Sequence, residues 1–149
     1  MTRAGFRRAL LACAVAAAGF ACGPVPGGPL AGEVAAAPAA WTDALGGDRA
    51  MCEIESRPAH PHSIQLECFA REGNLYVQSH RWALAKWWPE SWAAIWLREP
   101  DVRVRLGDRI FELRAERVTD AALRKVMLNE RGYDPVPEGI VLFRFDPRR

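Results

Sequence analysis

The sequence has no segment that is both long and apolar enough to span a membrane. Its one sizeable apolar run, ALLACAVAAAGFA at residues 9–21, is short and rich in alanine, whereas a spanning helix needs roughly 20 predominantly apolar residues. An internal repeat is also missing, and there are only three histidines in 149 residues. A metal site built from these histidines would need further ligands that the pattern does not supply, so we expect no bound metal.

A strong excess of charge of one sign is missing too. The chain has 20 Lys+Arg and 18 Asp+Glu, but three of the basic residues, Arg3, Arg7 and Arg8, belong to the N-terminal leader. Once the leader is removed, 17 basic residues stand against 18 acidic ones. Nucleic-acid binding needs a basic surface, so we expect no nucleic acid among the partners.

Residues 1–21 have the layout of an export signal: a basic start, a short apolar run and small residues before the cut. GFAC resembles a bacterial lipoprotein box, in which Cys22 would be acylated; ordinary cleavage nearby is the alternative. The pair Arg7-Arg8 also resembles the core of a twin-arginine signal, so the export route stays open. The leader predicts an exported protein of the bacterial cell envelope, either lipid-anchored to the membrane on the periplasmic side or free in the periplasm.

Residues 22–49 are rich in proline, glycine and alanine. This composition is typical of a flexible tether. Residues 50–149 are enough for one hydrophobic core and no more. We therefore predict one folded domain over residues 50–149.

Within that domain, several short segments alternate between apolar and polar residues, which predicts β-strands. The expected strands are MCEIES, HSIQLECFA, LYVQS, VRVRL, RIFELRAERV and GIVLFRF. Arg103 and Arg105 alternate with valines and are expected to face solvent. Thr119 or Asp120 can cap a helix that ends near Gly132. With a second short helix described below, the pattern predicts a mainly β fold, a closed or nearly closed barrel of six antiparallel strands.

The first hairpin also brings two cysteines together. If the chain folds back about His60, Cys52 lies directly opposite Cys68 on the same face of the sheet. In an oxidising compartment such a pair can form a disulfide. Two reduced cysteines in the core are the alternative.

Five of the six tryptophans lie in one segment: Trp82, Trp87, Trp88, Trp92 and Trp96. Trp92, Ile95 and Trp96 recur at helical spacing, which predicts a short helix packed against one end of the barrel. The other three tryptophans flank this helix and are harder to bury together. They are candidates for an exposed ligand slot or a membrane-facing patch.

The order of these features over residues 53–118 is a strand, a basic turn, a second strand, EGNLYVQS, the tryptophan helix, a proline and VRVRLGDRIFELRAERVTD. This order, with the spacing from Trp92 to Pro100, resembles the deazaflavin-dependent nitroreductase family. That family lies within the flavin-binding split β-barrel superfamily, which also holds pyridoxamine-phosphate-oxidase-like proteins. The resemblance implies a split β-barrel that binds FMN or a deazaflavin, whose cofactor carries out hydride transfer to a quinone-like or nitroaromatic acceptor. It also implies a homodimer.

The first turn departs from the family. The family has a glycine- and lysine-rich phosphate cradle there, whereas this chain has SRPAHPH and keeps Arg57 alone. Pro58 and Pro61 remove two backbone N–H donors. A ligand site at this end of the barrel is still indicated, because histidines and other basic residues would form a rim suited to a small aromatic or phosphorylated ligand. Solvated loop histidines are the alternative. The candidate binding residues are Arg57, His60, His62, Ser79, His80, Lys86 and Trp92.

Two functions remain open. The first is an envelope lipoprotein that uses the split barrel as a ligand-binding or interaction module without catalysis, which the altered turn favours. The second is an exported flavin- or deazaflavin-dependent oxidoreductase of the nitroreductase or quinone-reductase type. A twin-arginine leader would favour the second, because that route exports folded proteins with their cofactor in place. No catalytic residue is identified.

Overall fold

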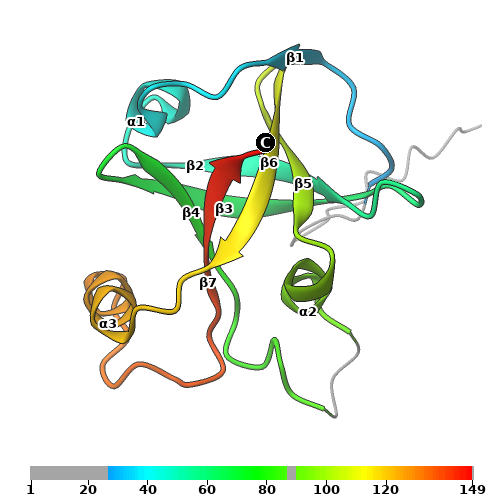
Figure 1. Cartoon of the computed structure of the whole chain (residues 1–149). Coiled ribbons are helices and arrows are strands. Elements are labelled where there is room, and N and C mark those ends of the chain that lie inside the picture. Colours follow the sequence, from blue (N-terminus) through cyan, green and yellow to red (C-terminus); the bar gives the residue numbers. More distant parts are fainter. Residues whose placement is uncertain (1–26, 87–89, 149) are drawn as a thin grey trace, which may run out of the picture.

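The computed structural model describes residues 27–86 and 90–148. Seven strands form one continuous sheet (Figure 1). They are β1 (Glu33–Ala35), β2 (Arg49–Ser56), β3 (His62–Arg71), β4 (Asn74–Gln78), β5 (Asp101–Leu106), β6 (Arg109–Arg117) and β7 (Leu142–Pro147). The strand order is β1-β6-β5-β2-β3-β4-β7, and β6 also pairs with β7. This last pairing closes β2 to β7 into the predicted six-stranded antiparallel barrel, and β1 is an additional strand.

Alternation along the strands fills the barrel. Cys52 and Ile54 of β2 and Val102 and Val104 of β5 are fully buried, because side chains two apart point to the same face of a sheet. The aromatic residues of β7 complete the same apolar cluster. Among the described residues, no helix is long and apolar enough to cross a bilayer.

Two short helices close the two ends of the barrel. The helix α1 (Trp41–Leu45) comes just before β2 begins and places Trp41 edge-on against Phe111, with ring centroids 5.0 Å apart. The helix α2 (Trp92–Arg98) lies near the other end of β2, and its Trp96 packs against Phe143 at 5.4 Å and Phe145 at 5.7 Å. The prediction of a tryptophan helix at one end is confirmed, whereas α1 was not predicted.

A third helix, α3 (Ala121–Glu130), packs on the outside of the barrel (Figure 1). Asp120 caps it, since its Oδ1 accepts hydrogen bonds from the backbone N–H groups of Ala122 at 2.9 Å and Leu123 at 3.0 Å. Met127 is buried against Tyr76 and its neighbours. Of the two predicted caps, Asp120 is therefore the correct one.

The described part of the predicted tether, residues 27–49, packs on the barrel. We call residues 27–31 the strap; it leads into β1, which pairs in parallel with β6. Leu30 and Trp41 are both buried. Composition alone could not show that this segment packs on the barrel, because backbone hydrogen bonds to a sheet do not depend on apolar side chains. The packed region thus extends N-terminal to residue 50, while the predicted signal at residues 1–21 and Cys22 lie outside the described residues.

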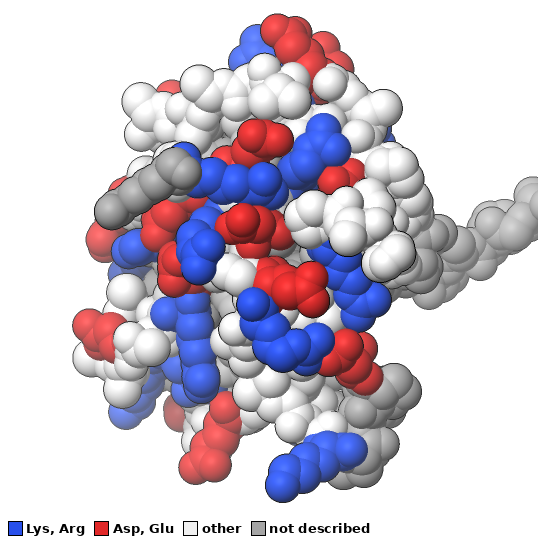
Figure 2. Space-filling view, turned by 45° about the vertical axis from the view of Figure 1, so that its right-hand side comes forward, with Lys and Arg blue, Asp and Glu red and all other residues white. Residues whose placement is uncertain are grey.

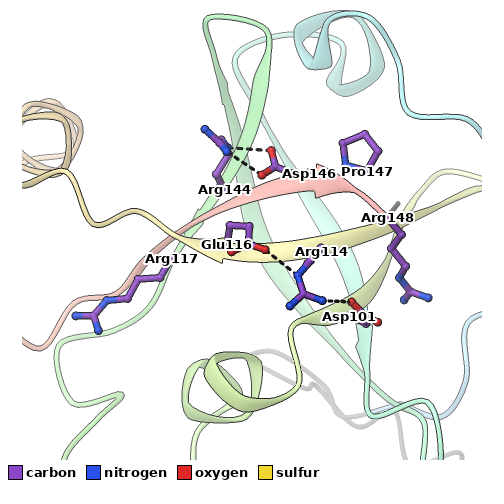
Figure 3. Close-up of a pocket in the computed structure, with 8 residues that line it drawn as sticks. All are labelled: Asp101, Arg114, Glu116, Arg117, Arg144, Asp146, Pro147 and Arg148. Atoms are coloured by element: carbon purple, nitrogen blue, oxygen red, sulfur yellow. Dashed lines mark hydrogen bonds and ion pairs between the residues drawn. The ribbon is translucent and has the colours of Figure 1, made fainter.

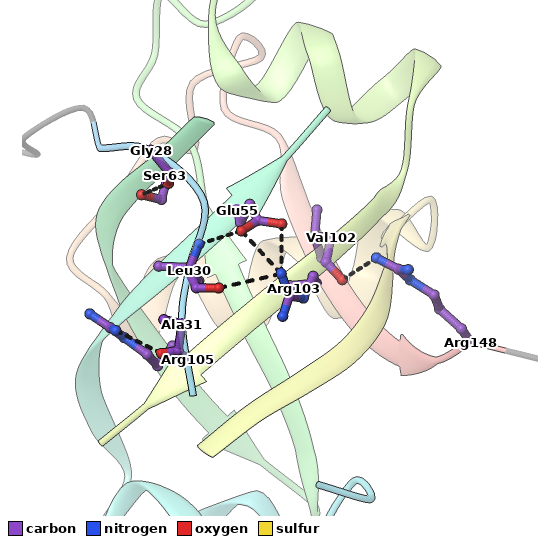
Figure 4. A network of polar contacts seen from close by, with 9 residues as sticks. All are labelled: Gly28, Leu30, Ala31, Glu55, Ser63, Val102, Arg103, Arg105 and Arg148. Atoms are coloured by element: carbon purple, nitrogen blue, oxygen red, sulfur yellow. Dashed lines mark hydrogen bonds and ion pairs between the residues drawn. The ribbon is translucent and has the colours of Figure 1, made fainter. Parts of the chain in front are cut away.

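The strap also changes the environment of two arginines expected to face solvent (Figure 4). Arg103 Nη1 lies 3.2 Å from Glu55 Oε1 and 3.4 Å from the Leu30 carbonyl oxygen. Arg105 Nη1 donates to the Ala31 carbonyl oxygen at 3.0 Å. The expectation was wrong because these two side chains hold the strap to the sheet and are partly covered by it.

Cys52 and Cys68 form the predicted disulfide, with their Cα atoms 5.9 Å apart and both side chains fully buried. The predicted register was wrong by two residues, because Cys52 lies opposite Leu66 and Cys68 opposite Ala50. The ladder runs closer to the turn than expected and shortens the loop. A slip of two residues keeps every side chain on its own face, so the two thiols can still meet diagonally.

Candidate functional site

A cavity of about 350 Å³ lies between the β2–β3 turn and the start of α2. Four of the seven predicted binding residues line it: Arg57, His62, His80 and Trp92. The first two flank the turn, His80 follows β4, and Trp92 begins α2. We call this space the α2 cavity. Its wall is completed by Ser56, Ile64, Glu90, Ser91 and Ile95.

The other three predicted residues do not line the cavity. His60 is exposed at the turn, where its backbone N–H donates to the Arg57 carbonyl oxygen at 2.8 Å. Ser79 is buried, and its Oγ accepts a hydrogen bond from the Val141 backbone N–H at 2.8 Å. It therefore joins the end of β4 to the segment before β7. Lys86 is exposed.

Trp92 forms the aromatic wall of the α2 cavity. Its ring centroid lies 4.5 Å from that of Trp96, which is fully buried and supports it from the core. Ser91 fixes the start of the helix, because its Oγ accepts from the Ala94 backbone N–H at 3.2 Å and donates to the Ala83 carbonyl oxygen at 2.6 Å. A serine followed by a helical apolar pattern is a recognisable N-cap signal, so Ser91 could have been found from the sequence.

The one arginine of the cavity already has an anionic partner. Arg57 Nη2 lies 3.3 Å from Glu90 Oε2, and Glu90 also pairs with Arg98 through its other oxygen. The hydrogen bond from Arg98, together with the charges of Arg98 and Arg57, lowers the pKa of the Glu90 carboxyl. Glu90 is thus an anion in the cavity wall. Nothing local in the sequence indicates this contact, since Arg57 and Glu90 are 33 residues apart.

These residues do not fit the phosphate of a flavin cofactor. In the β2–β3 turn, Pro58 and Pro61 have no N–H to donate, and the N–H of His60 is used within the turn. The carboxylate of Glu90 would repel a phosphate and competes with it for Arg57. Among the described residues, the α2 cavity included, no group of three or more His, Cys, Asp or Glu side chains could hold a metal ion.

A larger hollow, of about 1050 Å³, lies open on the outer face of β5, β6 and β7 (Figure 3). Its charges are largely paired: Arg114 lies 3.2 Å from Asp101 and 2.8 Å from Glu116, and Arg144 lies 2.8 Å from Asp146. The hydrogen bond to Asp146 raises the pKa of Arg144. Basic and acidic side chains also alternate over the face drawn in Figure 2. Paired, solvated charges contribute little binding energy, so the α2 cavity is the better candidate.

Together, the closed six-stranded barrel and the helix at its end define the split β-barrel class. Comparison with solved structures gives the same fold. A putative pyridoxamine 5'-phosphate oxidase from Listeria innocua matches with a TM-score of 0.50 and 17% identity, covering 66% of this chain and 84% of that one. A FAD-binding protein from Mesorhizobium loti matches with a TM-score of 0.47 and 15% identity, covering 70% and 82% respectively. At 17% identity, the likeness to the Listeria innocua protein shows the fold alone.

The sequence itself has no such match. No protein-family model matches it, and no curated protein does. The nearer kinship with deazaflavin-dependent nitroreductases therefore stays a prediction.

Proposed function

We propose that this chain is an exported, lipid-anchored envelope protein whose split barrel binds a small planar ligand in the α2 cavity and catalyses no redox reaction. The observation that carries the proposal is the convergence of Arg57, His62, His80 and Trp92 from three separate segments on one cavity. The leader and the lipoprotein-box cysteine, Cys22, support export and anchoring.

The wall of the α2 cavity favours an aromatic ligand of modest size. Trp92 offers aromatic surface, Ile64 and Ile95 add apolar surface, and His62 can hydrogen-bond a hydroxyl or carbonyl group. A volume of about 350 Å³ is near the lower end of the roughly 300–1,000 Å³ range of ligand sites. A small aromatic molecule fits these features better than a phosphorylated one, because Glu90 neutralises Arg57.

The second candidate is an exported flavin- or deazaflavin-dependent oxidoreductase. The observation in its favour is the split-barrel fold, shared with a putative pyridoxamine 5'-phosphate oxidase. The ion pair between Arg57 and Glu90 and the two prolines of the turn count against it. Kinship with the nitroreductase family would make a deazaflavin the expected cofactor of this second candidate.

Calorimetric titration of the purified protein separates the two candidates. The probes are FMN, a deazaflavin and 2-naphthol, the last as a small planar molecule with one hydroxyl. We expect saturable binding of 2-naphthol only, weakened about tenfold or more by Trp92→Ala, which is a loss of about 1.4 kcal/mol. Trp82→Ala is the matched control, because Trp82 is half exposed and does not line the cavity. Saturable binding of FMN or the deazaflavin would instead establish the oxidoreductase candidate, and no binding of any probe would remove both.

A further inference from the structure

The strap is fixed at its N-terminal end to the tip of the β2–β3 hairpin. The backbone N–H of Gly27 donates to the Ser63 carbonyl oxygen at 2.7 Å, and the Ser63 N–H donates back to Gly27 at 3.0 Å. The Ser63 hydroxyl also donates to the Gly28 carbonyl oxygen at 2.8 Å (Figure 4). A Cβ atom at Gly27 would come within 2.6 Å of Ser63 Oγ. The chain therefore enters the domain in close contact with the hairpin tip, residues 57–61.

This attachment limits the distance between the hairpin tip and the proposed lipid anchor. Only five residues lead from Cys22 to Gly27, and five residues span at most about 18 Å when fully extended. A compact chain of this size is on the order of 35 Å across. The hairpin tip can therefore reach the membrane surface, whereas the opposite side of the barrel is held away from it.

Residues 58–61 at the hairpin tip are exposed. The stretch from Ser56 to Ser63 contains Arg57, His60 and His62 and no acidic residue. Its arginine is paired with Glu90, so the position of the anchor, and not charge, brings the tip to the headgroups. Arg57 and His62 also line the α2 cavity, so the cavity lies on the side of the barrel that the anchor holds towards the bilayer.

We infer that the short connection orients the barrel, with the β2–β3 tip against the lipid headgroups and the α2 cavity facing the membrane. This inference rests on the lipid anchor of the proposed function. It adds that the small planar ligand of the cavity approaches Trp92 from the bilayer surface.

Fluorescence quenching in vesicles tests the orientation. The full-length chain is expressed with its leader, and the processed lipoprotein is reconstituted into vesicles of phosphatidylethanolamine and phosphatidylglycerol. One variant carries Ala59→Cys at the hairpin tip; the matched control carries Ala121→Cys at the exposed start of α3, on the other side of the barrel (Figure 1). Acylation blocks Cys22 and the disulfide occupies Cys52 and Cys68, so a thiol-reactive fluorophore labels only the introduced site.

We expect lipids with a nitroxide on the headgroup to quench the label at position 59 several-fold more than the label at position 121. Insertion of ten Gly-Ser residues after Gly23 should reduce this difference, because the longer connection lets the barrel turn. Equal quenching at both positions on an acylated protein overturns the orientation and leaves the lipoprotein proposal standing. Mass spectrometry that finds no acyl group on Cys22 overturns the anchor and this inference together.

Discussion

Reduction of the Cys52–Cys68 disulfide should lower the stability of the barrel by an amount that the loop length sets. The two cysteines are 16 residues apart, and a cross-link of this span stabilises the folded state by about 3 kcal/mol in the chain-entropy model. With a urea m-value of about 1.5 kcal/mol/M, the unfolding midpoint should fall by about 2 M. Because both side chains are fully buried, the reductant should react only through unfolding.

Urea unfolding followed by tryptophan fluorescence, with and without reductant, measures this shift. The reduced wild type keeps both sulfur atoms and isolates the cross-link. The double variant Cys52→Ala, Cys68→Ala should be less stable still, because it also leaves space in the core. Equal midpoints for oxidised and reduced wild type, together with two free thiols in the unreduced denatured protein, would show that no disulfide stabilises the barrel.

Three further predictions concern buried or capping groups. Arg103→Met leaves the buried carboxylate of Glu55 without its cation. The free energy of unfolding, measured with denaturant, should fall by about 2 kcal/mol, which is less than the roughly 3–5 kcal/mol of a fully buried pair because Arg103 is partly exposed. Burial raises the pKa of Tyr76 above 10.0. The stability that this shift contributes to the folded state is complete below pH 10 and is lost as the pH rises through the folded-state pKa. Tyr76→Phe should therefore flatten the curve of unfolding free energy against pH at that alkaline end. Asp120→Ala should cost about 1 kcal/mol in thermal or urea unfolding, whereas Thr119→Ala should be nearly neutral.

The barrel could be predicted because its signal is local. Inward side chains repeat every two residues along each strand, and this alternation is visible without knowing which strands are neighbours. The additional elements carry no such signal. The strand β1 has three residues and pairs through its backbone, and α1 has five residues with no side-chain hydrogen bond at its N-cap, Ala40. The burial of Trp41 makes sense only once the barrel end that it covers is known.

The α2 cavity was predicted in part for a similar reason. The order of strands brings the β2–β3 turn and the end of β4 to the same end of the barrel, so His62, His80 and Trp92 could be expected near one another. The anion in the wall could not be expected, because the contact between Glu90 and Arg57 depends on where the chain before α2 lies. That ion pair decides which ligands the α2 cavity favours, because Glu90 neutralises Arg57.

We propose that the α2 cavity holds a small planar ligand against Trp92. Its most direct test is a heteronuclear NMR titration of the ¹⁵N-labelled protein with 2-naphthol, read at the indole N–H groups and nearby amides. We expect saturable shifts for the Trp92 indole and the Ile95 amide, and none for the Trp41 indole at the opposite end of the barrel. Shifts spread evenly over both ends, or a Trp92 indole that does not move, would contradict it.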